Sequence, residues 1–244
     1  MITRRGMLAS GALMPVLGLT AGAARAAPGD APGSDWLSQF GFKNPEIEIT
    51  QPASVTGTAP ALAEEVTKAF GLLFGAPRDA KPFDVAQYFE GLTLKNKDGE
   101  HYNAEWASRW NPVIVGFFCM THQLPNAGDQ TSWCAAFANW CLGASGRPLT
   151  YSALAVSFAS YPTVNAATED PQIGDLVVFR DRSDPNHGHV GFFAGWDKST
   201  SDVRIKVLGG NQRGNTGTTG AVTTVSFSKD HDKNLEFHSF RSLA

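Results

Sequence analysis

Hydrophobic positions follow one period before Pro125 and another after it. In the first part, apolar residues recur mostly at three- and four-residue steps, as in the series Leu62, Val66, Phe70 and Leu73. This spacing predicts an amphipathic helix that stops at Gly75. The same reasoning predicts three further helical segments, at 82–90, 105–110 and 113–120.

After Pro125, short apolar stretches alternate with clusters of turn residues. One helix is expected there, at 133–142, and its buried face is formed by Trp133, Phe137, Trp140 and Cys141. Strands are expected at 173–179, 188–196, 203–208 and 221–227. A helix followed by at least four sequential strands indicates an α+β fold with an antiparallel sheet, in which the helix covers one face of the sheet.

Composition narrows the classes of function. Of the 244 residues, 42% are hydrophobic and 18% are charged, so the chain can bury a core. The formal net charge of −3 offers no basic field of the kind that binds nucleic acid. The three cysteines can form at most one bridge, which excludes a disulfide-stabilised scaffold.

The first 26 residues have the parts of a secretory signal peptide: a basic start, an apolar middle and a small-residue end. Arg4 and Arg5 resemble a twin-arginine export signal, and Ala24-Arg25-Ala26 supplies a cleavage pattern. We therefore expect a periplasmic or secreted chain with no stable membrane span after removal of the signal. An uncleaved anchor is the alternative, although glycines weaken its apolar region. Residues 27–60 are rich in turn-forming and small residues, which predicts a flexible tether.

The cysteines differ in their expected environments. Cys134 follows Thr131 and Ser132, two potential caps, at the predicted start of a helix. The positive end of the helix dipole favours the thiolate there, so we expect a lowered pKa and a nucleophilic role, against the alternative of a buried structural thiol. Cys119 and Cys141 lie in apolar stretches and are expected in the core, and a bridge between them stays open.

Among the polar residues of the second part, His189 begins a predicted strand. Alternation places it on one face with Gly191, which we expect to leave open space beside the imidazole. His187 is expected in an exposed loop. Asp175 is expected to fix a turn. Asn139 is interpreted as a residue of the helix surface, and Ser132 as a helix cap.

Four blocks taken together resemble the CHAP family. They are T-S-W-C-A-A-F-A-N-W-C-L at 131–142, I-G-D-L-V-V-F at 173–179, G-H-V-G-F-F at 188–193 and V-L-G-G-N-Q at 207–212. The members of this family are cysteine- and histidine-dependent amidohydrolases and peptidases of bacterial cell walls, within the papain-like superfamily. The resemblance covers about residues 105–228 and implies a catalytic domain at 105–244, preceded by an N-terminal helical section at 61–104.

The resemblance also implies roles for individual residues. Cys134 is the expected nucleophile, His189 the general base and Asn211 the residue that orients the imidazole. An oxyanion hole or groove would involve the Cys134 N–H and either Gln130 or Asp129. The implied substrate is peptidoglycan or another peptide-like amide. Either the muramoyl–alanine amide or a stem-peptide bond would be cut, with no cofactor or metal.

Two rival interpretations remain. A zinc peptidase is favoured by the H-x-H of His187 and His189 and by the spacing of His122 and Asp129, but no H-x3-D or H-E-x-x-H occurs in the chain. A wall-binding module that kept the fold and lost turnover would lack the nucleophile or the base, and this chain has both.

Overall fold

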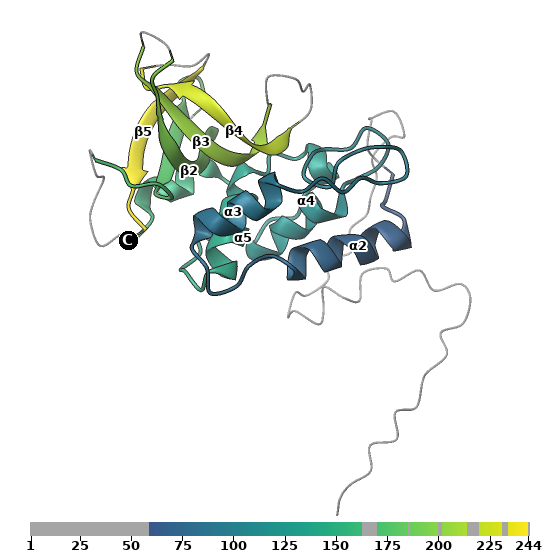
Figure 1. Ribbon diagram of the computed structural model, residues 1–244. Coiled ribbons are helices and arrows are strands. Elements are labelled where there is room, and N and C mark those ends of the chain that lie inside the picture. Colours follow the sequence, from purple (N-terminus) through teal and green to yellow (C-terminus); the bar gives the residue numbers. More distant parts are fainter. Residues whose placement is uncertain are drawn as a thin grey trace, which may run out of the picture. The chain divides into compact units, whose positions relative to one another are not determined.

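The computed structural model describes residues 59–162, 170–184, 186–199, 202–213, 220–230 and 234–243. The predicted signal peptide at 1–26 and nearly all of the predicted tether at 27–60 lie outside these residues. The described chain has helices gathered beside a sheet, with α2–α5 neighbouring one another (Figure 1).

The helices lie in the first part of the described chain. They are α2 (Ala63–Phe74), α3 (Pro82–Glu90), α4 (Pro112–Phe117) and α5 (Cys134–Ala144), with short 3-10 helices η1 (Phe118–Met120), η2 (Gly128–Gln130) and η3 (Ala155–Ser160). The helix predicted at 105–110 does not form. Its backbone N–H groups are taken by carboxylates: Trp106 donates to Asp129, and both Ala107 and Ser108 donate to Glu100.

The sheet has five antiparallel strands in the order β4-β3-β2-β1-β5. They are β1 (Leu176–Asp181), β2 (Gly188–Asp197), β3 (Arg204–Gln212), β4 (Ala221–Ser228) and β5 (Leu235–Arg241). Four of these strands were predicted from the sequence, and the fifth, β5, was not. The predicted α+β class with an antiparallel sheet is confirmed, and the architecture agrees with a papain-like arrangement.

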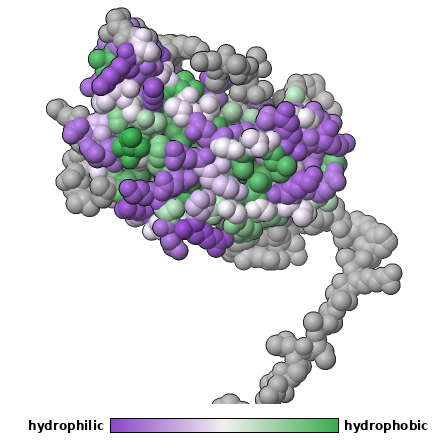
Figure 2. Space-filling view, viewed as in Figure 1, coloured by the Kyte–Doolittle hydropathy of each residue, from purple (hydrophilic) through white to green (hydrophobic). Residues whose placement is uncertain are grey.

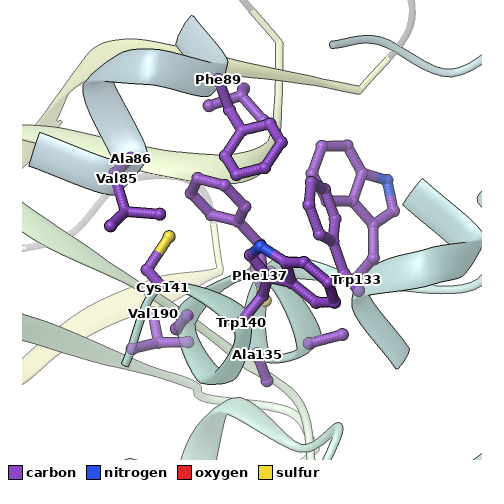
Figure 3. Close-up of a cluster of buried hydrophobic side chains, with 14 of the residues drawn as sticks. Val85, Ala86, Phe89, Trp133, Ala135, Phe137, Trp140, Cys141 and Val190 are labelled. Atoms are coloured by element: carbon purple, nitrogen blue, oxygen red, sulfur yellow. The ribbon is translucent and has the colours of Figure 1, made fainter. Parts of the chain in front are cut away.

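Helix α5 lies against β2 and β3 and is buried on every side, because all residues from Cys134 to Leu142 are buried. Figure 3 shows the cluster around it, with the rings of Phe89, Trp133 and Phe137 packed together. The prediction that Asn139 lies on the helix surface is wrong. Its amide is fully buried, where it donates to Ser152 O and accepts from Thr150 N.

Two hydrophobic clusters lie on opposite faces of the sheet. The larger one joins α2, α3, α4 and α5 to the sheet, so the predicted helical section and the catalytic section share one core. The smaller one covers the other face and consists of Val177, Phe179, Phe193, Ile205, Val207 and Phe240. Consecutive strand residues therefore belong to different clusters, and Val190 belongs to the larger one.

The surface mixes polar and apolar residues. Hydrophilic and hydrophobic residues are interspersed over the face seen in Figure 2. The large hydrophobic residues that are exposed lie on separate elements, such as Phe74 on α2 and Ile173 before β1. Across the described residues, no helix combines the length and the apolar character that crossing a membrane requires.

Candidate active site

Cys134 is the first residue of α5, and its position is fixed by Trp133 directly before it. The Trp133 indole packs over Gly210 of β3, where a Cβ would lie only 2.4 Å from the ring. Trp133 Nε1 also donates to Glu105 Oε1 at 3.2 Å, and Glu105 Oε2 accepts from Gly220 N at 2.8 Å. Glu105 thus connects the start of the helix to the segment just before β4. Sequence reasoning missed this carboxylate.

The predicted cap of α5 is not present. The N-cap residue is Trp133, no side chain caps the helix, and Ser132 is exposed. The N–H groups at the helix start are consequently left free of a capping side chain. The N–H groups of Cys134 and Ala135 face the Cys134 sulfur and favour its thiolate form.

The structure corrects the expected pKa of Cys134. The thiol is 5% exposed, and burial raises its pKa above the usual value. The backbone N–H groups of Val190, Ala135 and Cys134 itself lower the pKa, but their effect is smaller than that of burial. The resting group is therefore a protonated thiol, and a base has to remove its proton before it can act as a nucleophile.

All three cysteines are free thiols, so Cys119 and Cys141 are not bridged. The Cys141 sulfur points into the cluster shown in Figure 3, and burial raises its pKa well above the usual value. Cys119 is half-buried rather than in the core, and burial raises its pKa to about 11. Of the three cysteines, Cys134 is the one whose sulfur faces a backbone N–H group of β2, that of Val190.

His189 is the second residue of β2 and adjoins Val190, whose N–H faces the Cys134 sulfur. The structure thus brings the cysteine to the strand segment that carries the histidine, although no hydrogen bond joins the two side chains in the described chain. The imidazole is 6% exposed and stacks on Phe227, with ring centroids 5.2 Å apart. Burial lowers its pKa to about 4, so the ring is neutral at neutral pH and able to accept a proton.

The expected open space beside His189 is not there. A Cβ at Gly191 would lie 2.5 Å from Val207 Cγ1 and 2.8 Å from Leu208 O. Gly191 therefore allows β3 to approach closely, and it does not form a substrate pocket. Alternation along one strand shows which face Gly191 is on. It does not show whether a neighbouring strand fills the space above that face.

The residue that interacts with the His189 ring is Gln212, the neighbour of Asn211. The β3–β4 register shifts between Gly209 and Gln212, and Asn211 has a left-handed backbone with φ of 57°. The Asn211 side-chain oxygen points toward Gly220. By contrast, the Gln212 side chain is 3% exposed and interacts with the His189 imidazole. The role predicted for Asn211 stays a prediction.

Of the two oxyanion candidates, Asp129 does not line a groove. It is fully buried, and its Oδ2 accepts from Trp106 N at 2.8 Å and Asn111 N at 2.9 Å. Burial raises the pKa of this carboxyl to about 6. Its role is to hold the loop before α4. Gln130 is exposed, four residues before Cys134, and its predicted role remains untested by the geometry.

The remaining polar residues behave mostly as expected. Asp175 fixes the turn before β1, because its carboxylate accepts from Gln172 N at 2.8 Å and from Leu243 N at 2.9 Å. The predicted exposure of His187 is confirmed, and its ring lies 3.3 Å from Asp184. Within the described ranges, no three His, Cys, Asp or Glu side chains are grouped so that they could hold a metal ion.

Comparison with known families identifies the segment that contains this site. Residues 126–211 match the family model of the CHAP domain, which supports a CHAP-type domain in this part of the chain. The match includes α5, β1, β2 and most of β3. The class is a hydrolase of the amidase or peptidase kind, of the type that acts on peptidoglycan. Searches of curated proteins and of solved structures found no match.

Proposed function

We propose that the protein is an exported cysteine hydrolase that cleaves an amide bond in peptidoglycan. The observation that carries this proposal is the placement of Cys134 at the start of α5, with its sulfur facing the N–H of the residue after His189. A free thiol and a neutral imidazole meet the needs of nucleophilic attack with general-base help. The CHAP domain supports the substrate class.

The proposed reaction has two stages. His189 takes the proton from the Cys134 thiol as the sulfur attacks the amide carbonyl carbon, and the N–H groups of α5 stabilise the thiolate. The imidazolium then gives that proton to the leaving amine as the C–N bond breaks, which leaves a thioester on Cys134. His189 then deprotonates a water molecule, which attacks the thioester and breaks the C–S bond. The imidazolium returns its proton to the sulfur, and the released carboxylic acid loses its proton to solvent.

The proposed site of action is the periplasm or the cell exterior. The support for export is the leader itself, with Arg4 and Arg5 before an apolar region and a small-residue end. Peptidoglycan lies outside the cytoplasmic membrane, so a hydrolase with this substrate has to be exported. Either the muramoyl–alanine amide or a stem-peptide bond fits the proposed chemistry.

Paired substitutions test the cysteine mechanism. Cys134→Ser and His189→Ala should each lower turnover of purified peptidoglycan by about 100-fold or more, because each removes a partner in the proton transfer. Cys141→Ser is the matched control, since it changes a second buried thiol of the same helix. Zinc content should be negligible, and activity should survive a chelator. Full activity of Cys134→Ser, or loss of activity on chelation, would favour the zinc peptidase.

A further inference from the structure

We propose that Gln212 is the positioning residue that orients the imidazole of His189, a role that rests on the proposed Cys134–His189 mechanism. The two side chains meet at the end of β3, where the strand bulges between Gly209 and Gln212. The bulge brings Gln212 rather than Asn211 to the histidine. Resemblance alone had pointed to Asn211.

The backbone around Gln212 fixes which end of its amide faces the histidine. Its Nε2 donates to Val207 O at 3.2 Å and to Thr223 O at 2.7 Å. Carbonyl oxygens can only accept, so the amide nitrogen must lie on their side. The Nε2 atom also lies 2.8 Å from the place where a Cβ of Gly209 would be, so only glycine leaves it room there. The amide oxygen is therefore held away from both carbonyls.

Two buried atoms are left to pair with each other. Gln212 Oε1 and His189 Nε2 are both buried, and within the described residues neither atom makes a hydrogen bond of standard geometry. The Gln212 side chain acts on the imidazole as an acceptor does, since it favours the protonated ring. An amide oxygen can only accept, so the ring nitrogen must donate. This pairing would place the hydrogen of the neutral ring on Nε2.

This tautomer has a consequence for catalysis. With hydrogen on Nε2, the lone pair lies on Nδ1, which then serves as the base. When Nδ1 takes the proton from Cys134, the Gln212 oxygen stabilises the imidazolium that forms. The stacked ring of Phe227 restricts the plane of the imidazole, and Gln212 selects its tautomer within that plane.

Nitrogen-15 NMR of the His189 ring in the full-length protein tests the proposal. The wild type should show hydrogen on Nε2 and a bare Nδ1. Gln212→Leu should lose this preference and lower kcat about tenfold or more with little change in KM. Gln212→Glu keeps an acceptor and adds charge, so it should keep the tautomer and raise the pKa of His189 above about 4. Gln87→Leu is the matched control, because it makes the same change on the exposed face of α3.

The outcomes separate this proposal from the proposed function. Hydrogen on Nδ1 in the wild type would overturn the role of Gln212, as would an unchanged tautomer in Gln212→Leu. The role would return to Asn211 if Asn211→Ala lost the Nε2–H tautomer of His189 and Gln212→Glu also differed from the wild type in its tautomer. Should Gln212→Leu fail to fold, Gln212→Glu and Asn211→Ala still decide. A wild type that shows the expected tautomer without cleaving peptidoglycan would refute the hydrolase and not the pairing.

Discussion

Burial governs the resting protonation of Cys134 and His189. It raises the pKa of the Cys134 thiol and lowers the pKa of the His189 imidazole to about 4. Both shifts favour the neutral form, so the resting groups are a thiol and a neutral ring instead of a thiolate and an imidazolium.

The neutral pair gives a pH prediction for alkylation. Between pH 5 and 9, labelling of Cys134 by iodoacetamide should rise steadily with pH, by roughly tenfold per unit, because the thiolate fraction rises below a raised pKa. Peptide mapping by mass spectrometry reads each cysteine separately. Cys141 should label more slowly at every pH. A rapid labelling rate of Cys134 at pH 5–6 that does not change with pH would indicate an ion pair and contradict this picture.

The positions of Cys134 and His189 in their elements could be predicted from local sequence, since a helix start and an alternating strand are local patterns. The protonation states of the two side chains could not be predicted in this way. It depends on desolvation by segments distant in the chain, such as β4 with Phe227. Asn139 shows the same limit, because its polar side chain is buried through bonds to a loop that no periodicity reveals.

At the scale of elements, the position of Cys134 depends on how closely α5 approaches β3. Gly210 allows this approach, since a Cβ there would lie 2.4 Å from the Trp133 ring and 2.8 Å from Phe137 Cβ. The Trp133 ring and Phe137 Cβ cannot move aside easily, because neither is the free end of a flexible side chain. The glycine therefore fixes the place of the helix start that carries Cys134.

Gly210→Ala should destabilise the protein by about 1–3 kcal/mol, because the added methyl group overpacks the contact between helix and sheet. Urea unfolding measures the change. Gly71→Ala in α2 is the control, since no atom lies within 4 Å of its Cβ position, and it should stabilise the protein by about 0.5–1 kcal/mol. Equal effects of the two substitutions would show that the close approach at Gly210 carries no energetic weight.

Element types followed from periodicity wherever hydrophobic contacts set the structure, as in α3 and β2. Periodicity did not predict the structure where side chains form hydrogen bonds with the backbone N–H groups. Glu100 takes the N–H groups of Ala107 and Ser108, which prevents the helix expected at 105–110. The bulge between Gly209 and Gln212 is likewise invisible in V-L-G-G-N-Q, because it depends on pairing with β4.

At the scale of the whole molecule, the proposal of export rests on the sequence of the leader. Replacing Arg4 and Arg5 together with Lys should leave unprocessed precursor in the cytoplasm, because the paired arginines are the expected export signal. Cell fractionation with immunoblotting reads the result. Normal secretion of the double variant would indicate an ordinary secretory signal instead.

The most direct test of the central claim is digestion of purified sacculi, with the new chain ends identified by mass spectrometry. The mature wild-type protein should release fragments with one new type of amine and carboxylate end, which also names the bond that is cut. Cys134→Ser should release none above background. Sacculi left intact by the wild type, or equal release by Cys134→Ser, would contradict a cysteine hydrolase of peptidoglycan.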